Sequence, residues 1–289
     1  MNYAVLMAAL DLDLPTRGVL TASARLADLF GARTLGIAAG EATISPYFAD
    51  GPVADKFVAT VESELRAQLK SVEGAFRQAN SARSDRIEWR SAERLPDNFI
   101  LSSARAADLI VVAKPPDMGN LMHGPDVGNL MLQSGKPVLV VPADAEDFAA
   151  ERVLIAWKDT REARRAVSDA LPILKKAEEV HLLVIHEPET NEAAAIASAD
   201  DVVNLLARHG VKAIAVAQPD YGGVGKSIEE YAEDIEADII VPVPLVTTVS
   251  WSGCSAASPA TSCAARTQAC CSRTDGAVGD GRPKLANSE

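Results

Sequence analysis

The sequence predicts an α/β protein with two parallel-sheet domains in tandem, the second of them incomplete. Residues 151–187 contain a short apolar run, an amphipathic stretch and a second apolar run, which is the pattern of a βαβ unit. The same pattern occurs near the N-terminus, where VLMA at 5–8 corresponds to VLIA at 153–156. ADLIV at 107–111 also recurs as ADIIV at 237–241. The chain therefore reads as a duplication.

In the first half, apolar periodicity predicts alternating strands and helices over residues 1–143. In chain order they are strand Tyr3–Leu10, helix Pro15–Phe30, strand Thr34–Ala39, helix Lys56–Ala79, strand Arg86–Ser91, helix Asn98–Ala106, and strands Leu109–Ala113 and Pro137–Val141. Pro15 at the opening of the first helix and Gly31 after its end are typical of those positions. Residues 143–150 are the expected linker.

The second half repeats this order over residues 151–242. The expected elements are strand Val153–Trp157, a helix that Asp159 or Thr160 caps, strand Val180–Ile185, helix Ile196–Arg208, strand Val211–Ala217, helix Ile228–Ile235 and strand Ile239–Val241. Ser227 and Glu230 have the spacing of a capping box for the last helix. No apolar run like PVLVV at 137–141 follows, so we expect residues 243–289 to be a disordered tail.

Composition restricts the classes of function. The chain has 289 residues, 48% of them hydrophobic, and a formal net charge of −12, which disfavours nucleic acid and anionic membranes as partners. No apolar run reaches the roughly 20 residues of a transmembrane helix, and no basic segment of a signal peptide is evident, so we expect a cytoplasmic protein. The four cysteines, all between 254 and 271, match no zinc spacing, and no metal site is expected from them.

Asp159 is the principal candidate for a binding residue. It follows a buried strand and precedes a helix, and parallel sheets usually bind ligands in the crevice at that end of their strands. Asp11 occupies the matching position in the first half. The structural alternative for each aspartate is a helix N-cap.

The segment AWKDTREARRAVSDALPIL at 156–174 and the paired ADLIVV and ADIIV strands resemble the universal stress protein (UspA-like) family in its tandem form, over about residues 1–242. The resemblance implies two Rossmann-like domains of the adenine nucleotide alpha hydrolase-like type. It also implies that an Asp after strand one holds the adenosine part of ATP or a related adenine nucleotide. A loop after strand four, with glycines spaced G-x2-G-x9-G, would cradle the phosphates.

The resemblance assigns the adenosine role to Asp159 and its neighbours. Ala156, Thr160 and Ile185 are expected to shape the pocket, and His186 lies near it at the end of its strand. No catalytic residue is implied, and no metal beyond the Mg²⁺ that accompanies a nucleotide. Self-association, or pairing of the two halves, is the expected assembly.

The first half departs from the family pattern. In AKPPDMGNLMHGPDVG at 113–128 the glycines have the wrong spacing, and two prolines stand where the first glycine should follow. We therefore expect this half not to bind nucleotide and Asp11 to serve as a helix cap.

The second half departs from the family pattern in another way, because the amino-acid sequence from Val243 onwards has no helix or strand periodicity. We hypothesise that this region is read in the wrong frame. In the shifted frame, each codon consists of the last base of one residue's codon and the first two bases of the next. Permitted codon choices then allow the translation GAFGHNRLLEWMFGGVTRDLLR, which contains the G-x2-G-x9-G spacing. A segment that can end in SVLLSH and a stop codon follow. A gene frameshift and a sequencing error both remain open.

Three functions remain to be weighed. The first is regulatory binding of an adenine nucleotide, weakened or lost in this chain, without substantial catalysis. The second is an interaction module that binds no nucleotide. The third is a P-loop phosphotransferase, for which Gly225-Lys226-Ser227 is the only support, because Asp220 stands where the first P-loop glycine should be.

Overall fold

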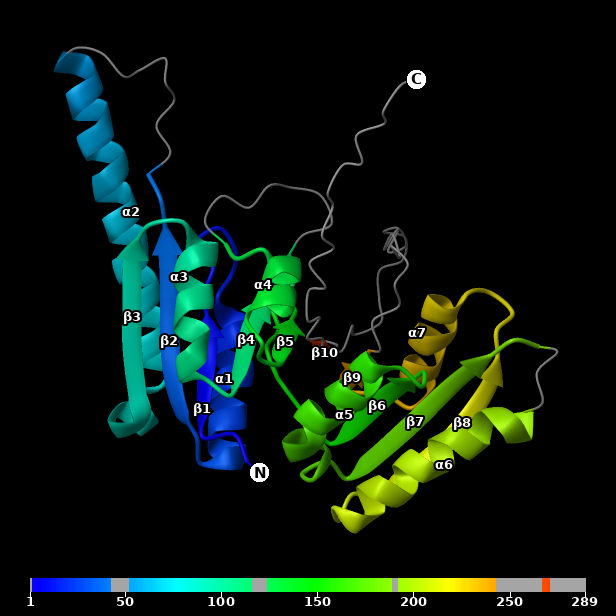
Figure 1. The fold of residues 1–289 in the computed structure, drawn as a ribbon. Coiled ribbons are helices and arrows are strands. Elements are labelled where there is room, and N and C mark those ends of the chain that lie inside the picture. Colours follow the sequence, from blue (N-terminus) through cyan, green and yellow to red (C-terminus); the bar gives the residue numbers. More distant parts are fainter. Residues whose placement is uncertain (1, 43–51, 116–123, 189–191, 243–266, 271–289) are drawn as a thin grey trace, which may run out of the picture.

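The computed structural model describes residues 2–42, 52–115, 124–188, 192–242 and 267–270. Two α/β halves lie side by side (Figure 1). The first contains β1 (Val5–Ala9), α1 (Arg17–Phe30), β2 (Arg33–Gly40), α2 (Pro52–Ala79), β3 (Ile87–Glu93), α3 (Pro96–Ser103), β4 (Leu109–Ala113), α4 (Val127–Gln133) and β5 (Val138–Val141). The second contains β6 (Arg152–Trp157), α5 (Arg161–Leu174), β7 (Glu179–His186), α6 (Glu192–Arg208), β8 (Ala213–Pro219), α7 (Val224–Asp234) and β9 (Ile239–Val241), and β10 (Thr267–Cys270) follows.

The sheet topology confirms the predicted fold class. The order is β3-β2-β1-β4-β5 in the first half and β9-β6-β7-β8 in the second, with every neighbouring pair parallel. The first strand of each half, β1 or β6, lies between the second and fourth strands of that half. This is the arrangement of a doubly wound sheet, whose strand order reverses beside the first strand.

β10 joins the two parallel sheets. It pairs antiparallel with β5 and parallel with β9. It therefore takes the place beside β9 that β5 takes beside β4 in the first half. The rest of the expected tail, 243–266 and 271–289, lies outside the described residues, as do parts of the expected loops at 43–51 and 116–123.

Several helices differ from the sequence prediction; α2 and α6, for example, each begin four residues before the expected start. α4 was not expected, and it begins where the Asp126 carboxylate accepts a hydrogen bond from Asn129 N (3.1 Å). α7 begins at Val224, four residues before the expected start, so Ser227 lies within the helix and does not cap it. The capping-box prediction is therefore wrong.

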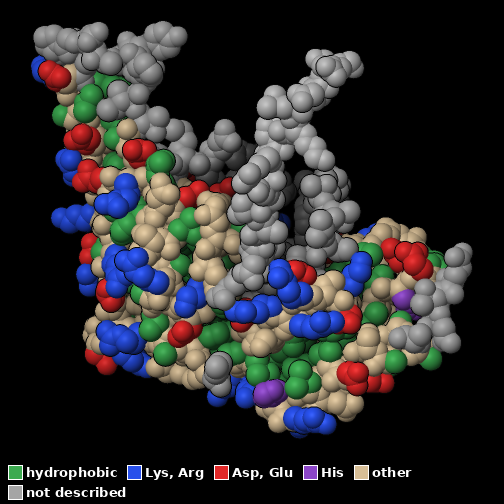
Figure 2. Space-filling model, viewed as in Figure 1, with side chains coloured by type: hydrophobic (Ala, Val, Ile, Leu, Met, Phe, Trp, Pro, Cys, Tyr) green, Lys and Arg blue, Asp and Glu red, His purple; other side chains and the backbone are tan. Residues whose placement is uncertain are grey.

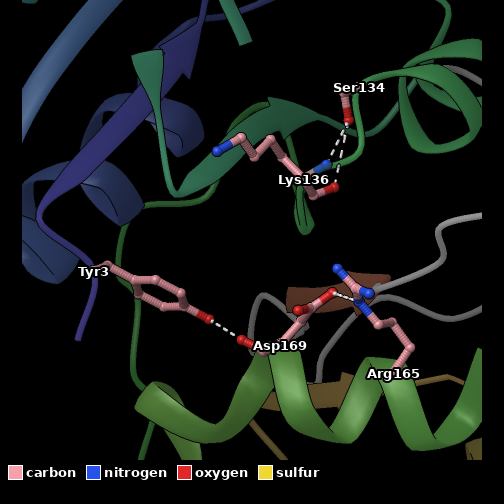
Figure 3. A network of polar contacts seen from close by, with 5 residues as sticks. All are labelled: Tyr3, Ser134, Lys136, Arg165 and Asp169. Atoms are coloured by element: carbon pink, nitrogen blue, oxygen red, sulfur yellow. Dashed lines mark hydrogen bonds and ion pairs between the residues drawn. The ribbon is translucent and has the colours of Figure 1, made fainter. Parts of the chain in front are cut away.

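A shared core connects the halves. One apolar cluster contains buried side chains of α1 and α2 on one sheet and of α5 and α6 on the other. α3 and α4 cover the opposite face of the first sheet, and α7 covers that of the second. The buried Tyr3 donates a hydrogen bond from its hydroxyl to the Asp169 carbonyl in α5 (2.7 Å), and Arg165 contacts the Asp169 carboxylate (Figure 3). The two halves therefore pack as one body.

The same carboxylate clamp occurs in both halves. Asp108 Oδ2 accepts hydrogen bonds from Ala4 N (2.8 Å) and Val5 N (3.0 Å) at the start of β1. Asp238 Oδ2 accepts from Glu151 N (2.9 Å) and Arg152 N (2.8 Å) at the start of β6. Each aspartate thus fixes the beginning of the first strand against the beginning of the fourth strand.

No helix within the described segments combines the length and the apolar character needed to cross a membrane. The expected boundaries at 143, 151 and 242 stay predictions.

Replacing either clamp aspartate should destabilise the protein. Asp108→Ala and Asp238→Ala each leave two strand-start N–H groups without their charged acceptor, so each should lower the free energy of unfolding by about 1–3 kcal/mol. Urea denaturation measures the effect, with Asp201→Ala on the exposed face of α6 as the control. Equal stability of all three variants would show that the clamp contributes nothing.

Gly18 and Gly74 should respond oppositely to alanine. A Cβ at Gly18 would lie 1.9 Å from the Pro142 carbonyl oxygen, whereas one at Gly74 meets nothing within 4 Å. Gly18→Ala should cost about 1–3 kcal/mol through overpacking, and Gly74→Ala should stabilise α2 by about 0.5–1 kcal/mol. Thermal unfolding of both variants checks the pair; a melting temperature for Gly18→Ala at or above that of the wild type contradicts the packing described here.

Candidate functional site

The candidate site lies at the carboxyl end of the second sheet. Asp159 is two residues beyond the end of β6, and Asp11 is two residues beyond the end of β1, as the alignment of the halves predicts. Because β6 lies between β7 and β9, Asp159 sits beside the point where strand order reverses. Such points are the usual ligand-binding positions of open parallel sheets.

Asp159 is exposed and paired with a neighbouring cation. Its Oδ1 accepts from Arg164 Nε (2.9 Å) and lies 2.7 Å from Arg164 Nη2. The side chains of Asp159 and Arg164 are 53% and 63% exposed. Asp159 therefore reaches solvent, and its carboxylate pairs with the long Arg164 side chain rather than with a helix N–H group.

Thr160, the next predicted site residue, is the N-cap of α5. Its hydroxyl accepts a hydrogen bond from Ala163 N (3.2 Å). The pKa of Glu162 is lowered, first by a hydrogen bond from its own backbone N–H and further by Arg161 and the Thr160 hydroxyl, against a smaller opposing effect of burial. Two of the backbone N–H groups at the start of α5, those of Glu162 and Ala163, are thus engaged by side chains of Glu162 and Thr160.

The remaining predicted residues divide between the two faces of the sheet. Ala156 is buried and, by strand alternation, shares the α7 face with Leu154 and Ile185. His186 points to the α5–α6 face, as Trp157 does. The structure therefore brings Ala156 and Ile185 to one side, and His186 to the other.

His186 and Trp157 both have an unsatisfied ring nitrogen. His186 Nδ1 lies 2.8 Å from the Glu187 carbonyl oxygen, to which it donates. His186 Nε2 and Trp157 Nε1 are buried and have no hydrogen-bond partner among the residues that the structure describes. A contact of His186 with a ligand stays a prediction, and it would have to come from the α5–α6 face.

In the first half, the backbone at Gly124 covers the equivalent aspartate. Asp11 is only 5% exposed and accepts a hydrogen bond from Asp13 N (2.7 Å). A Cβ on Gly124 would lie 1.8 Å from Asp11 Oδ2, so the backbone at Gly124 rests against this carboxylate. The expectation that Asp11 caps α1 is wrong: α1 begins at Arg17, its N-cap is Thr16, and no side chain caps it.

The Gly225-Lys226-Ser227 segment does not form a phosphate cradle. Asp220 Oδ1 accepts hydrogen bonds from Gly223 N (2.7 Å) and Gly222 N (3.3 Å). The chain's own carboxylate thus occupies the position where a phosphate would bind. Lys226 pairs with Glu230 instead, at 3.4 Å.

Sequence reasoning missed a polar network beneath α7. His181 is buried; its Nδ1 lies 2.7 Å from the Tyr231 hydroxyl and its Nε2 2.7 Å from Glu179 Oε1. Burial, and then the negative charges of Glu179 and Asp234, raise the pKa of Tyr231. The folded state favours the neutral form of Tyr231, and this preference stabilises the protein. The stabilisation is complete below the ordinary tyrosine pKa of about 10, and it is lost as the pH rises through the higher pKa that Tyr231 has in the folded state. The network fastens α7 to β7.

The surface charge is not uniform. Lys and Arg side chains gather across the middle of the visible face, between the halves, with a few acidic side chains among them (Figure 2). An anion can therefore approach this face locally despite the net charge of −12.

The Thr160 cap should be measurable. Thr160→Ala removes the acceptor for Ala163 N and should lower the free energy of unfolding by about 0.5–2 kcal/mol, whereas Thr160→Ser keeps a hydroxyl there. Chemical denaturation of both variants makes the comparison. A serine variant as unstable as the alanine variant would argue against the cap.

Comparisons with known proteins support the fold. No family model and no curated protein matches the sequence. A universal stress protein structure from Archaeoglobus fulgidus is 16% identical, with a TM-score of 0.65, and the match covers 94% of this chain and 97% of the other. A provisionally named universal stress protein from Pseudomonas aeruginosa UCBPP-PA14 gives 14% identity, a TM-score of 0.53, and coverage of 87% and 84%.

A third structure, a functionally unknown protein from Pseudomonas aeruginosa PAO1, gives 15% identity, a TM-score of 0.51, and coverage of 94% and 93%. Identities this low concern the fold alone. The chain therefore has the fold of the universal stress proteins over nearly its whole length.

Proposed function

We propose that this chain is a universal stress protein-like regulatory protein whose second half binds the adenosine part of ATP or a related adenine nucleotide, without substantial catalysis. The observation that carries the proposal is Asp159, an exposed carboxylate at the carboxyl end of β6 beside the reversal of strand order. We also propose that the protein acts in the cytoplasm and that neither nucleic acid nor a membrane is its partner.

The residues at this position fit a nucleoside better than a phosphate. The Asp159 carboxylate can accept hydrogen bonds from an amino group or from ribose hydroxyls. Ile185, which is partly buried, presents an apolar side chain on the α7 face of the sheet, and the buried Ala156 lies on the same face. The donors of α5 are used by Thr160 and Glu162, so the helix start offers less to a phosphate.

Phosphate affinity in this chain should be weak for a separate reason. The amino-acid sequence after Pro242 lacks the G-x2-G-x9-G spacing, and translation in the shifted reading frame restores it. We propose that the family's phosphate loop has been lost here through a change of reading frame. DNA sequencing around codon 242 tests this: an unshifted reading that encodes the printed tail in independent isolates of the gene would reject it.

A second candidate is an interaction module that binds no nucleotide. The covered carboxylate of Asp11 favours it for the first half. For the second half, the exposed Asp159 favours binding.

Asp159→Ala should weaken adenosine binding. Loss of a charge-assisted hydrogen bond should weaken binding about tenfold or more, because such bonds contribute about 1.5–3 kcal/mol. Isothermal titration of the full chain with adenosine measures the effect, and Asp201→Ala on α6 is the matched control. Adenosine affinity that is the same in the wild type and in Asp159→Ala rejects the assignment of the residue, and absence of binding by all three proteins favours the interaction module.

A further inference from the structure

We infer that Arg164 controls access to the proposed adenosine site by competing with the ligand for the Asp159 carboxylate. The inference rests on the proposed function and concerns the regulation of the same site. It makes Arg164 a residue that sets affinity without contacting the ligand.

The geometry places Arg164 on the atoms that a ligand would need. Both Nε (2.9 Å) and Nη2 (2.7 Å) approach the same oxygen, Oδ1 of Asp159. An adenosine amino or hydroxyl group approaching this carboxylate must displace the guanidinium or share the carboxylate with it.

The Asp159–Arg164 ion pair can break without disturbing the helix. Arg164 lies on α5, five residues after Asp159, and the two side chains are 63% and 53% exposed. Within the described segments, the Arg164 side chain makes no other hydrogen bond or ion pair, and the α5 cap uses Thr160 rather than Asp159. The helix can therefore stay intact when the ion pair breaks.

Arg165 provides a matched control on the same helix. It pairs with Asp169 at 3.4 Å, one helical turn further along, and not with Asp159. Removing Arg165 deletes an equal charge from α5 while leaving the Asp159–Arg164 pair in place.

The size of the effect follows from the exposure of the pair. Exposed ion pairs contribute about 0.2–1 kcal/mol, so their removal changes the affinity of a competing ligand by at most about fivefold. Salt screens the pair, since the Debye length falls from about 30 Å at 0.01 M to about 3 Å at 1 M. Adenosine is uncharged, so its own binding does not carry this salt dependence.

The test is isothermal titration of the full-length wild type, Arg164→Ala and Arg165→Ala with adenosine, at 0.01, 0.1 and 1 M NaCl. We expect Arg164→Ala to bind adenosine up to about fivefold more tightly than the wild type at 0.01 M salt. The wild type should approach the variant as salt rises, while Arg164→Ala changes little. Arg165→Ala should follow the wild type at every salt concentration.

The outcomes separate the inference from the proposed function. If the proteins bind adenosine but Arg164→Ala equals the wild type, or binds more weakly, Arg164 is not a competitor and the inference is overturned. If Arg165→Ala gains the same affinity, general charge rather than the Asp159–Arg164 pair is responsible, which also overturns it. If none of the three binds adenosine, the proposed function fails for this chain. Equal melting temperatures of the variants confirm that the folded protein is being compared.

Discussion

The aspartate clamp between the first and fourth strands is the constraint on which the rest of each half depends. Asp108 and Asp238 accept two backbone N–H groups each, from the residues that begin β1 and β6. These contacts tie the start of the first strand to the start of the fourth strand and support the register of that pair. With the register fixed, the residue two positions beyond the strand end reaches the carboxyl edge of the sheet, beside the reversal of strand order. The clamp at one end thus positions Asp11 and Asp159 at the other.

The halves share this framework and differ at its carboxyl edge. Gly124 rests on the buried Asp11 carboxylate, so the first half has filled its own crevice. Asp159 remains exposed and, among the described residues, pairs with Arg164. The two halves therefore share one fold and differ at this edge: Asp11 is packed beneath Gly124, whereas Asp159 is open to solvent. The shared apolar cluster, with the Tyr3 hydrogen bond to α5, joins the two into one body.

Much of this framework could be predicted from local patterns, because parallel strands are continuous apolar runs and their helices are periodic. The strands β4 and β9 agree with the sequence prediction residue for residue, and the repeat located Asp159 correctly. The starts of α4 and α7 were harder to predict, because side chains just before the helices shape them. Asp126 accepts a hydrogen bond from Asn129 N in the first turn of α4, and Asp220 accepts from Gly222 N and Gly223 N immediately before α7. The clamps and the position of β10 depend on contacts between distant residues. The Arg164 contact needed the coordinates, since Asp159 looks like a helix cap in the sequence alone.

The most direct test of the account is the nucleotide content of the protein with its reading frame restored after Pro242, measured by native mass spectrometry after purification without added nucleotide. The account predicts one adenine nucleotide per chain, held by the second half alone. Two nucleotides per chain would contradict the closed first half, and none would contradict the binding role of Asp159.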